Sequence, residues 1–565
     1  MPKMIAYSAT PNPYFNDKAQ EVAKIYDGFF FVIGSWDGGV IANLGLGDGT
    51  PTTTDWKEKV RENLIHLRSA GVTENLLGVY FGSDDEWPSP KTLLSEEYKS
   101  KIARHFAAIG REAKELGFRG VSIDVEYPFP RFELDHEIYT YNGYTQDDLL
   151  KAAKDQGRTT MAALLDEFPD VVVFVLPGYI WARPIARNFM SGMLEVTAER
   201  DAPGGFHLAS ERAYSLLDPV SQVALSREGD LSVLALVNDP KILDYWKRRC
   251  TVAPGVWPLH MVETGGRDYP VRPWAQELEE IKQQMGILRV LAKRYMWSFS
   301  GQPLWYKYTP ELEEKYGLKR QKIDATGMAQ VLMRQKKGSL DVAIEGWHAI
   351  LQDKSTTNDP KILKLIVAVQ SFDKGELDAV GLCNKLGTPC EWLVLGLLGN
   401  PFIQPEFAAP DAIHGQLRLN DPVRGRDGDV RWFRFRNHEP LGAVRLIAAF
   451  DWGRTDKSSA HIISSINSPA ETDAYLLIAW DDGVAVWLND KLIFDHLKYP
   501  EYGHGAFFRD RYDFEEKIPI KIPEGESRLA ITCVNLVGSW ALAVRIVDKD
   551  GFPIEGLTFS IPSTQ

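Results

Sequence analysis

Residues 120–125 read GVSIDV, and residues 171–176 read VVVFVL. The second run is continuously apolar rather than alternating, as a parallel strand that is buried on both faces requires. The stretch between them, residues 147–168, has apolar side chains at helical spacing. The three segments together predict a strand–helix–strand unit with parallel strands.

The same alternation extends over the first three hundred or so residues. Eight strands with intervening helices fit a closed (β/α)8 barrel, which typically takes about 250 residues. An open doubly wound sheet usually carries a glycine-rich loop after its first strand, and AYSATPNPYF contains no GxGxxG. The stretch 231–249 could displace one of the later strands. Besides the two strands above, we expect strands at 4–8, 28–34, 76–81, 205–209, 256–262 and 294–299, and helices at 17–26, 56–70 and 96–116.

The chain of 565 residues is too long for one hydrophobic core. We expect an α/β catalytic barrel over residues 1–304 and a helical connector over 305–391, with helices near 341–352, 360–373 and 377–386. From Trp392 the pattern changes to short β runs separated by turns such as DDG and KDG. Residues 392–565 are therefore predicted to form an all-β, jelly-roll-like sandwich that resembles carbohydrate-binding accessory domains.

Composition excludes several classes of function. The net charge of −13 argues against nucleic acid or an anionic membrane as the main partner. No apolar stretch of about 20 residues is present to span a membrane. The four cysteines form no CxxC, and the N-terminus MPKMIAYSAT shows no leader. We expect a cytoplasmic protein, or a secreted or periplasmic one whose leader was removed; the oligomeric state is left open.

Barrel enzymes carry their working residues at the C-terminal ends of the strands. Here those positions offer carboxylates and imidazoles that can bind sugar hydroxyls, and aromatic rings on which sugars stack. The pattern therefore predicts a carbohydrate substrate. The candidate substrate-binding residues are Trp36, Asp37, Tyr80, Asp85, Tyr127, Tyr179, Trp181, His207, Glu211, His260 and Trp297.

The fourth strand supplies the candidate catalytic pair. Residues two apart on a strand face the same side, so Asp124 and Glu126 should both point into the barrel. Two carboxylates so close cannot both ionise freely, and one pKa should rise. A glutamic acid with a raised pKa can protonate a glycosidic oxygen near neutral pH.

Residues 117–126, GFRGVSIDVE, resemble the fourth-strand signature of the chitinase-like glycoside hydrolases, Gly-Phe-Asp-Gly-Ile-Asp-Ile-Asp-x-Glu. Arg119 and Ser122 replace the first two aspartates of that signature, whereas Asp124 and Glu126 are retained. The aromatic run 295–297 is similar to the family's strand with its barrel-floor tryptophan. The resemblance implies that Glu126 is the general acid and that Asp124 orients an N-acetyl group of the substrate, which acts as nucleophile.

Two other catalytic pairings stay open. Glu126 with Glu263, on the predicted seventh strand, resembles the large superfamily of retaining barrel glycosidases. Asp124 as nucleophile with Glu211 as acid resembles the α-galactosidases. We rank Glu126 first as acid and Asp124 second as nucleophile or orienting group, and expect retention, which requires carboxyl groups about 5–5.5 Å apart. HxH, HExxH and GxSxG are absent, so no zinc and no serine nucleophile is expected.

Structural roles compete with these assignments. Asp124 could hold the strand end, Glu211 and Arg212 could form a surface pair, and His207 and His260 could be packing residues. At the level of the whole protein, the rivals of a glycoside hydrolase are a glycan-binding barrel without catalysis and a sugar lyase or isomerase that uses Glu126 or His260 as base.

In the C-terminal part, residues 481–490, DDGVAVWLND, resemble a hairpin of PA14-type sugar-binding sandwiches. Asn489 and Asp490 predict a tight turn, and Trp487 is expected in the core. Calcium at Asp481 and Asp482 is the only cofactor that this resemblance suggests. We favour a module that buttresses the barrel over one that binds sugar independently.

Overall fold

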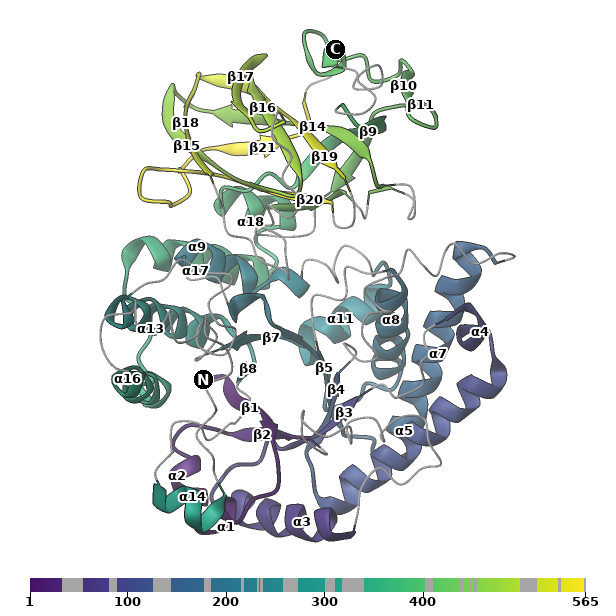
Figure 1. Cartoon of the computed structure of the whole chain (residues 1–565), viewed down its shortest axis with the longest axis vertical. Helices are drawn as coiled ribbons and strands as arrows, with labels where there is room; N and C mark the ends of the chain where they lie inside the picture. Colours follow the sequence, from purple (N-terminus) through teal and green to yellow (C-terminus); the bar gives the residue numbers. More distant parts are fainter. Residues whose placement is uncertain are drawn as a thin grey trace. The chain divides into compact units, whose positions relative to one another are not determined.

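Eight parallel strands close into a barrel in the N-terminal part of the chain, in order β1 to β8, which confirms the predicted (β/α)8 architecture (Figure 1). Each strand pairs with the next, and β1 pairs with β8. The strands are β1 (Lys3–Ala9), β2 (Gly28–Phe31), β3 (Leu76–Tyr80), β4 (Gly120–Asp124), β5 (Val172–Leu176), β6 (Phe206–Ser210), β7 (Thr251–Val256) and β8 (Tyr295–Ser298).

The structure is a computed structural model that describes residues 1–32, 54–80, 89–124, 144–176, 184–214, 218–230, 233, 237–257, 273–299, 310–317, 340–401, 410–436, 442–446, 449–450, 455–497, 516–536 and 540–562. The chain forms two units. The barrel unit comprises Met1–Pro219 and Val233–Thr357, and the sandwich unit comprises Val220–Ser232 and Asn358–Gln565. Their boundary at residue 357 lies inside the stretch 305–391 that was expected to form a connector.

Helices surround the barrel, as Figure 1 shows. Helix α5 has a capping residue at each end: it begins after Ser95, whose side chain accepts a hydrogen bond from Tyr98 N, and it ends before Gly117, which has a φ of 88°. The helices of this unit are α1 (Pro13–Asp17), α2 (Ala19–Val22), α3 (Thr54–Ser69), α4 (Pro90–Leu93), α5 (Glu96–Leu116), α7 (Gln146–Glu167), α8 (Pro184–Glu199), α11 (Pro240–Arg249), α13 (Trp274–Leu291), α14 (Pro310–Tyr316) and α16 (Leu340–Gln352), with the one-turn helix η3 (Arg212–Tyr214).

Two sequence-based assignments in the barrel are wrong. The seventh strand is Thr251–Val256, not residues 256–262. Pro254 and Gly255 made this strand hard to recognise in the sequence, because both residue types are rare inside strands. The apolar residues that follow them gave a stronger strand pattern. The helix expected at 17–26 is two short helices, because Asn12 caps a helix that starts at Pro13 instead.

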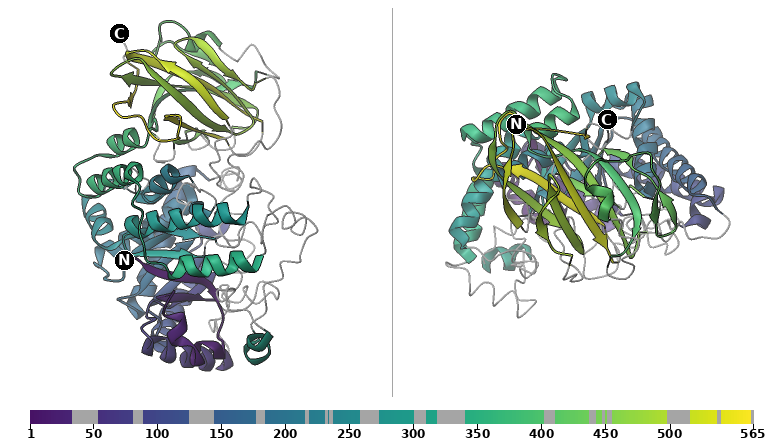
Figure 2. Two further views of the ribbon diagram at one scale, coloured as in Figure 1. Left: turned by 90° about the vertical axis from the view of Figure 1, so that its left-hand side faces the viewer. Right: turned by 90° about the horizontal axis from the view of Figure 1, so that it is seen from above.

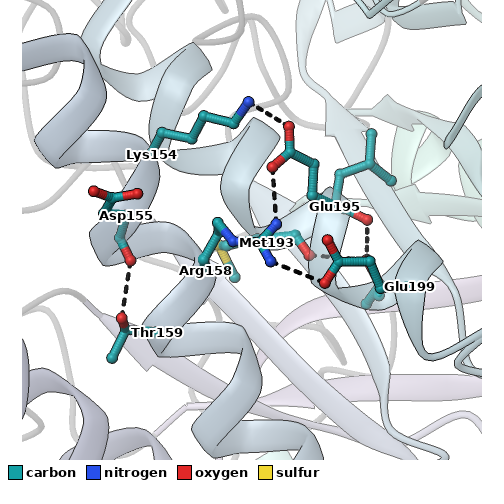
Figure 3. Close-up of polar contacts among 9 residues, drawn as sticks. Lys154, Asp155, Arg158, Thr159, Met193, Glu195 and Glu199 are labelled. Atoms are coloured by element: carbon teal, nitrogen blue, oxygen red, sulfur yellow. Dashed lines mark hydrogen bonds and ion pairs between the residues drawn. The ribbon is translucent and has the colours of Figure 1, made fainter. Parts of the chain in front are cut away.

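Glycines let α7 and α8 pack closely. A β-carbon on Gly157 would lie 1.9 Å from the Phe189 carbonyl oxygen, and one on Gly192 would lie 2.1 Å from that of Lys154. Beside this contact, Arg158 on α7 forms 2.9 Å ion pairs with Glu195 and Glu199 on α8, and Lys154 also pairs with Glu195 (Figure 3). The glycines set the spacing of the two helices, and the ion pairs fix their register.

In the sandwich unit, two large antiparallel sheets enclose a core (Figure 2), and β10 and β11 pair as a separate two-stranded sheet. The larger sheet has the order β12-β9-β14-β19-β16-β17 with β21 beside β14, and the smaller has the order β13-β20-β15-β18. The sandwich of the sequence prediction is confirmed. Its elements are α9 (Pro219–Leu225, from Val220 on), α17 (Pro360–Asp373), α18 (Ala379–Lys385), β9 (Glu391–Gly399), β10 (Val423–Gly425), β11 (Gly428–Val430), β12 (Phe433–Arg436), β13 (Ala443–Arg445), β14 (Ser458–Ser468), β15 (Thr472–Trp480), β16 (Gly483–Leu488), β17 (Lys491–Asp495), β18 (Glu516–Ile522), β19 (Gly525–Asn535), β20 (Ala541–Val547) and β21 (Thr558–Ser560), with the 3-10 helix η6 (Pro410–Ile413).

The hairpin between β16 and β17 has the predicted turn, since Asn489 and Asp490 take φ values of 48° and 64°. Trp487, however, is not in the core between the sheets. Val484, Val486 and Leu488 face that core, so alternation places Trp487 on the opposite face of the sheet, where it is only partly buried.

Candidate functional site

Asp124 is the last residue of β4, and its side chain points into the barrel. Its Oδ2 accepts a 2.9 Å hydrogen bond from the Tyr7 hydroxyl of β1. Strand β1 pairs with β2 and β8, so this bond joins strands that are not neighbours and must cross the lumen. Val121 and Ile123 pack instead in the core that contains the helix residues. The inward orientation predicted for residue 124 is therefore present.

Tyr7 is a site residue that the sequence did not reveal, because a tyrosine in a strand is ordinary packing. Tyr7 is 4% exposed and Asp124 is 6% exposed. A buried carboxylate needs hydrogen bonds to replace those that it loses from water, and the phenol supplies one. The bond also restricts Asp124 to one orientation, which a catalytic carboxylate requires.

Aromatic rings gather beside this pair, at the strand ends. We call Tyr7, Tyr214, Trp257, Trp297 and Phe299 the aromatic cluster. The Tyr7 ring lies 5.9 Å from that of Trp297 and 5.4 Å from that of Phe299. Tyr214 lies 5.5 Å from Trp297 and 5.3 Å from Trp257, all between ring centroids. Tyr214, Trp257 and Phe299 follow the ends of β6, β7 and β8, so the cluster lines the C-terminal side of the barrel.

Within the cluster, Trp297 forms the base rather than a surface. Its side chain is fully buried, and its indole N–H donates a 3.1 Å hydrogen bond to the Ala253 carbonyl. Tyr214, Trp257 and Phe299 retain partial exposure. Trp297 was predicted to bind substrate, but in this arrangement it is fully buried and supports Tyr7 and Tyr214, whereas Tyr214, Trp257 and Phe299 keep some exposed surface.

Gly255 on β7 makes this packing possible. A β-carbon at this position would lie 2.7 Å from Cε2 of Trp297 and 2.8 Å from Cε1 of Tyr214. Carbon atoms pack at about 3.5–4.0 Å, so both rings occupy space that only a glycine leaves free. Gly255, one of the two residues that made β7 hard to recognise in the sequence, thus has a packing role at the site.

Glu211 follows β6 directly and is partly buried. Its carbonyl accepts a 2.9 Å hydrogen bond from Tyr214 N, which closes the one-turn helix η3. Since all barrel strands are parallel, Glu211 lies at the same end of the barrel as Asp124.

His207 lies at the other end of the barrel, which corrects its assignment to the substrate site. Its Nε2 is 3.0 Å from the Gly204 carbonyl, and its ring packs 5.0 Å from that of Tyr295, the first residue of β8. Tyr295 in turn donates to Glu74, which precedes β3. Burial lowers the pKa of His207 to about 3, so the imidazole is neutral and serves packing.

Most of the other predicted residues lie outside the described part of the chain. Tyr80 ends β3 and is in register with Asp124, but its side chain lies outside the described part of the chain. The corrected β7 ends at Val256, so the strand expected to carry His260 and Glu263 ends before both. The predicted residues outside the described ranges are Trp36, Asp37, Asp85, Glu126, Tyr127, Tyr179, Trp181, His260 and Glu263.

Among the described residues, no three His, Cys, Asp or Glu side chains gather in a way that could hold a metal ion. At the calcium position suggested by the PA14-type resemblance, Asp482 Oδ2 already accepts a 2.6 Å hydrogen bond from Leu536 N. Calcium needs six to eight oxygen ligands, and the described residues there do not assemble them. The helices within the described ranges include none that is long and apolar enough to cross a membrane.

No protein family and no curated protein matches this sequence. Among solved structures, the chain is similar to the exo-beta-1,4-mannosidase Op5Man5 from Opitutaceae bacterium strain TAV5, with 10% identity and a TM-score of 0.32 over 66% of this chain and 68% of the mannosidase. It is also similar to the isomalto-dextranase of Arthrobacter globiformis T6, with 10% identity and a TM-score of 0.28 over 97% of this chain and 96% of that one. Similarities of this size carry no conclusion about activity.

Proposed function

We propose that this protein is a glycoside hydrolase whose active site lies at the C-terminal end of the barrel, around Asp124. One observation carries the proposal: a buried carboxylate at the end of β4 points into the lumen and is held by Tyr7. In (β/α)8 enzymes this end of the barrel holds the active site. A carboxyl group kept there against the cost of burial is a candidate for catalysis.

The proposed chemistry needs a second carboxyl group. Glu126, two residues further along the chain, is our first choice as general acid. It would donate its proton to the glycosidic oxygen as the bond to the anomeric carbon breaks. Asp124 would then attack the anomeric carbon as nucleophile, or orient an N-acetyl group of the substrate that does so. A water molecule would then attack the anomeric carbon, give up a proton to Glu126 and displace Asp124 or the N-acetyl oxygen, so that the configuration is retained.

Glu211 and Glu263 are the alternate acids. Glu211 has the better structural support, because it lies at the same barrel end as Asp124. The aromatic cluster supports a sugar as substrate, since its half-buried rings offer apolar surface beside a carboxylate. We also retain as proposed substrate contacts the residues expected at the same rim, namely Trp36, Asp37, Tyr80, Asp85, Tyr127, Tyr179, Trp181 and His260.

A panel of p-nitrophenyl glycosides and natural oligosaccharides tests the proposal. The wild-type chain should release p-nitrophenol or a reducing sugar from at least one member, and Glu126→Gln should lose nearly all of this turnover. Asp170→Asn is the matched control, because Asp170 is an exposed carboxylate that pairs with Arg119 before β5. It should leave turnover unchanged.

The same panel distinguishes the rival functions. Saturable sugar binding without any product would indicate a glycan-binding barrel and overturn the proposal. An unsaturated or isomerised product in place of a new reducing end would indicate a lyase or an isomerase. Full activity of Glu126→Gln would remove Glu126 as the acid, and Glu211→Gln and Glu263→Gln would then identify which alternate supplies it.

A further inference from the structure

Two of the four buried cysteines lie side by side in the sandwich unit. Cys383 belongs to α18, and Cys390 directly precedes β9. A side-chain hydrogen bond joins their thiol groups, so the two sulfur atoms are in contact. Cys383 is 2% exposed and Cys390 is 3% exposed. The other two cysteines are placed elsewhere: Cys250 is in the barrel unit, and the thiol of Cys533 on β19 donates to the Ala541 carbonyl.

The chain turns back between the two cysteines because α18 ends in a left-handed glycine. Gly387 has a φ of 74°, which a glycine adopts at little cost. Thr388 N donates a 3.0 Å hydrogen bond to the Cys383 carbonyl, and Gly387 N donates one of 3.1 Å to the Asn384 carbonyl. These two bonds form a Schellman motif, which closes the end of a helix. The turn directs the chain back along the helix that it has just left, and this brings Cys390 to Cys383.

The turn is also attached to both sheets of the sandwich. Ile546 N on β20 donates a 2.8 Å hydrogen bond to the Gly387 carbonyl. Phe559 N on β21 donates one of 3.0 Å to Asn384 Oδ1. Strand β20 belongs to the smaller sheet, whereas β21 lies beside β14 of the larger one. A crosslink between α18 and the start of β9 would therefore restrain a segment that connects the two sheets.

We propose that Cys383 and Cys390 are a redox pair, which an oxidant of the small-disulfide class converts into a disulfide that locks α18 to the start of β9. The thiolate of one cysteine attacks a sulfur atom of the oxidant and releases one thiol, and the other cysteine then attacks the mixed disulfide and releases the second thiol. The protein loses two protons and two electrons, and the oxidant takes them up as it becomes two thiols.

The surroundings of the pair determine when this reaction can take place. The hydrogen bond to Cys390, and next burial, raise the pKa of Cys383 well above its usual range. Only a thiolate is an effective nucleophile, and the oxidant has to reach the sulfur atom, so the closed native state should react slowly. Oxidation should take place during folding or when α18 opens locally. Because burial also shields the finished disulfide from reductants, the state of the pair should reflect the redox conditions in which the chain folded.

Refolding of the reduced, full-length chain in a buffer of reduced and oxidised glutathione tests the reaction. After alkylation, peptide mass spectrometry should find a Cys383–Cys390 disulfide in most molecules, with Cys250 and Cys533 alkylated. The folded, reduced protein should acquire the disulfide at least about 10-fold more slowly in the same buffer, because opening must come first.

Two results would overturn the proposal. One is alkylation of both Cys383 and Cys390 in the refolded protein, and the other is a disulfide that involves Cys250 or Cys533 instead. If the chain does not refold from denaturant, long incubation of the native protein with oxidised glutathione in sub-denaturing urea opens the segment and gives the same outcomes.

Hydrogen exchange of the oxidised and reduced forms tests the locking. Amides of peptides covering 379–390 should exchange at least about 10-fold more slowly in the oxidised form, because a crosslink removes chain entropy from the open state. Peptides covering 96–116 in the barrel unit should not change. The matched controls are Cys390→Ser, which should exchange alike in both buffers, and Cys533→Ser, which should keep the disulfide and its effect. A disulfide that leaves exchange over 379–390 unchanged would contradict the locking.

Discussion

Replacing Gly255 by alanine would insert a methyl group where two rings of the aromatic cluster meet. The new β-carbon would lie 2.7 Å from Trp297 Cε2, 2.8 Å from Tyr214 Cε1 and 2.9 Å from the Ser210 carbonyl oxygen. To reach ordinary contact distances near 3.5 Å, the rings must move by roughly 0.7–0.8 Å. The carbonyl belongs to the neighbouring strand β6 and cannot move without it. Overpacking of this kind costs about 1–3 kcal/mol.

We expect Gly255→Ala to lose about 1–3 kcal/mol of unfolding free energy and to change the near-ultraviolet circular dichroism of the aromatic residues. A displacement near 1 Å at an active site can cost on the order of 10²-fold in rate, so kcat/KM should fall on a comparable scale. Urea unfolding, the dichroism spectrum and glycoside kinetics measure the three effects.

Gly483→Ala is the matched control for this prediction. Gly483 also lies in a strand, but its β-carbon would be 3.5 Å from the nearest atom, an ordinary contact. It should leave stability equal or slightly higher, since alanine restricts the unfolded chain. If Gly255→Ala matched Gly483→Ala in stability, spectrum and activity, the packing argument for the site would be refuted.

Tyr7→Phe should lower kcat more than it raises KM, and cost about 1.5–3 kcal/mol in unfolding free energy, because Asp124 loses a buried hydrogen bond; wild-type kinetics and stability would contradict this. Burial, and next the charge of Asp482, raise the pKa of Asp481 from 3.8 to about 7. Between these pH values the folded state keeps a proton that the unfolded state has lost, so wild type loses stability as pH rises from 4 to 7, by about 4 kcal/mol at most. Asp481→Asn removes this penalty and should gain stability over wild type at pH 8 but not at pH 4, as measured by urea unfolding at both; a difference independent of pH would contradict it.

The features that were predictable from sequence depend on local patterns. The buried parallel strands β4 and β5 show as apolar runs, and the direction of Asp124 follows from alternation along one strand. Helix α5 was predicted with its observed bounds, because its apolar residues recur at helical spacing. In the structure, Ser95 and Gly117 cap its two ends.

The features that were missed depend on partners far away in the sequence. Tyr7 meets Asp124 across 117 positions, and Arg227 meets Asp373 across 146, so no local pattern identifies either pair. His207 was predicted as a site residue because its strand was identified correctly. The position of its side chain along the barrel axis, near the N-terminal end of β6, was not. The prediction for Trp487 failed for a similar reason. Which face of its sheet packs against the core depends on the other sheet, and the sequence of one strand does not specify this.

The turnover of Asp124→Asn tests most directly whether the inward carboxylate on β4 does chemistry. The amide keeps the size of the side chain and can still accept a hydrogen bond from Tyr7, so folding should be preserved by circular dichroism and urea unfolding. On the glycoside that wild type cleaves fastest, we predict a loss of at least about 10²-fold in kcat/KM. Wild-type kcat/KM in a folded Asp124→Asn protein would contradict the account.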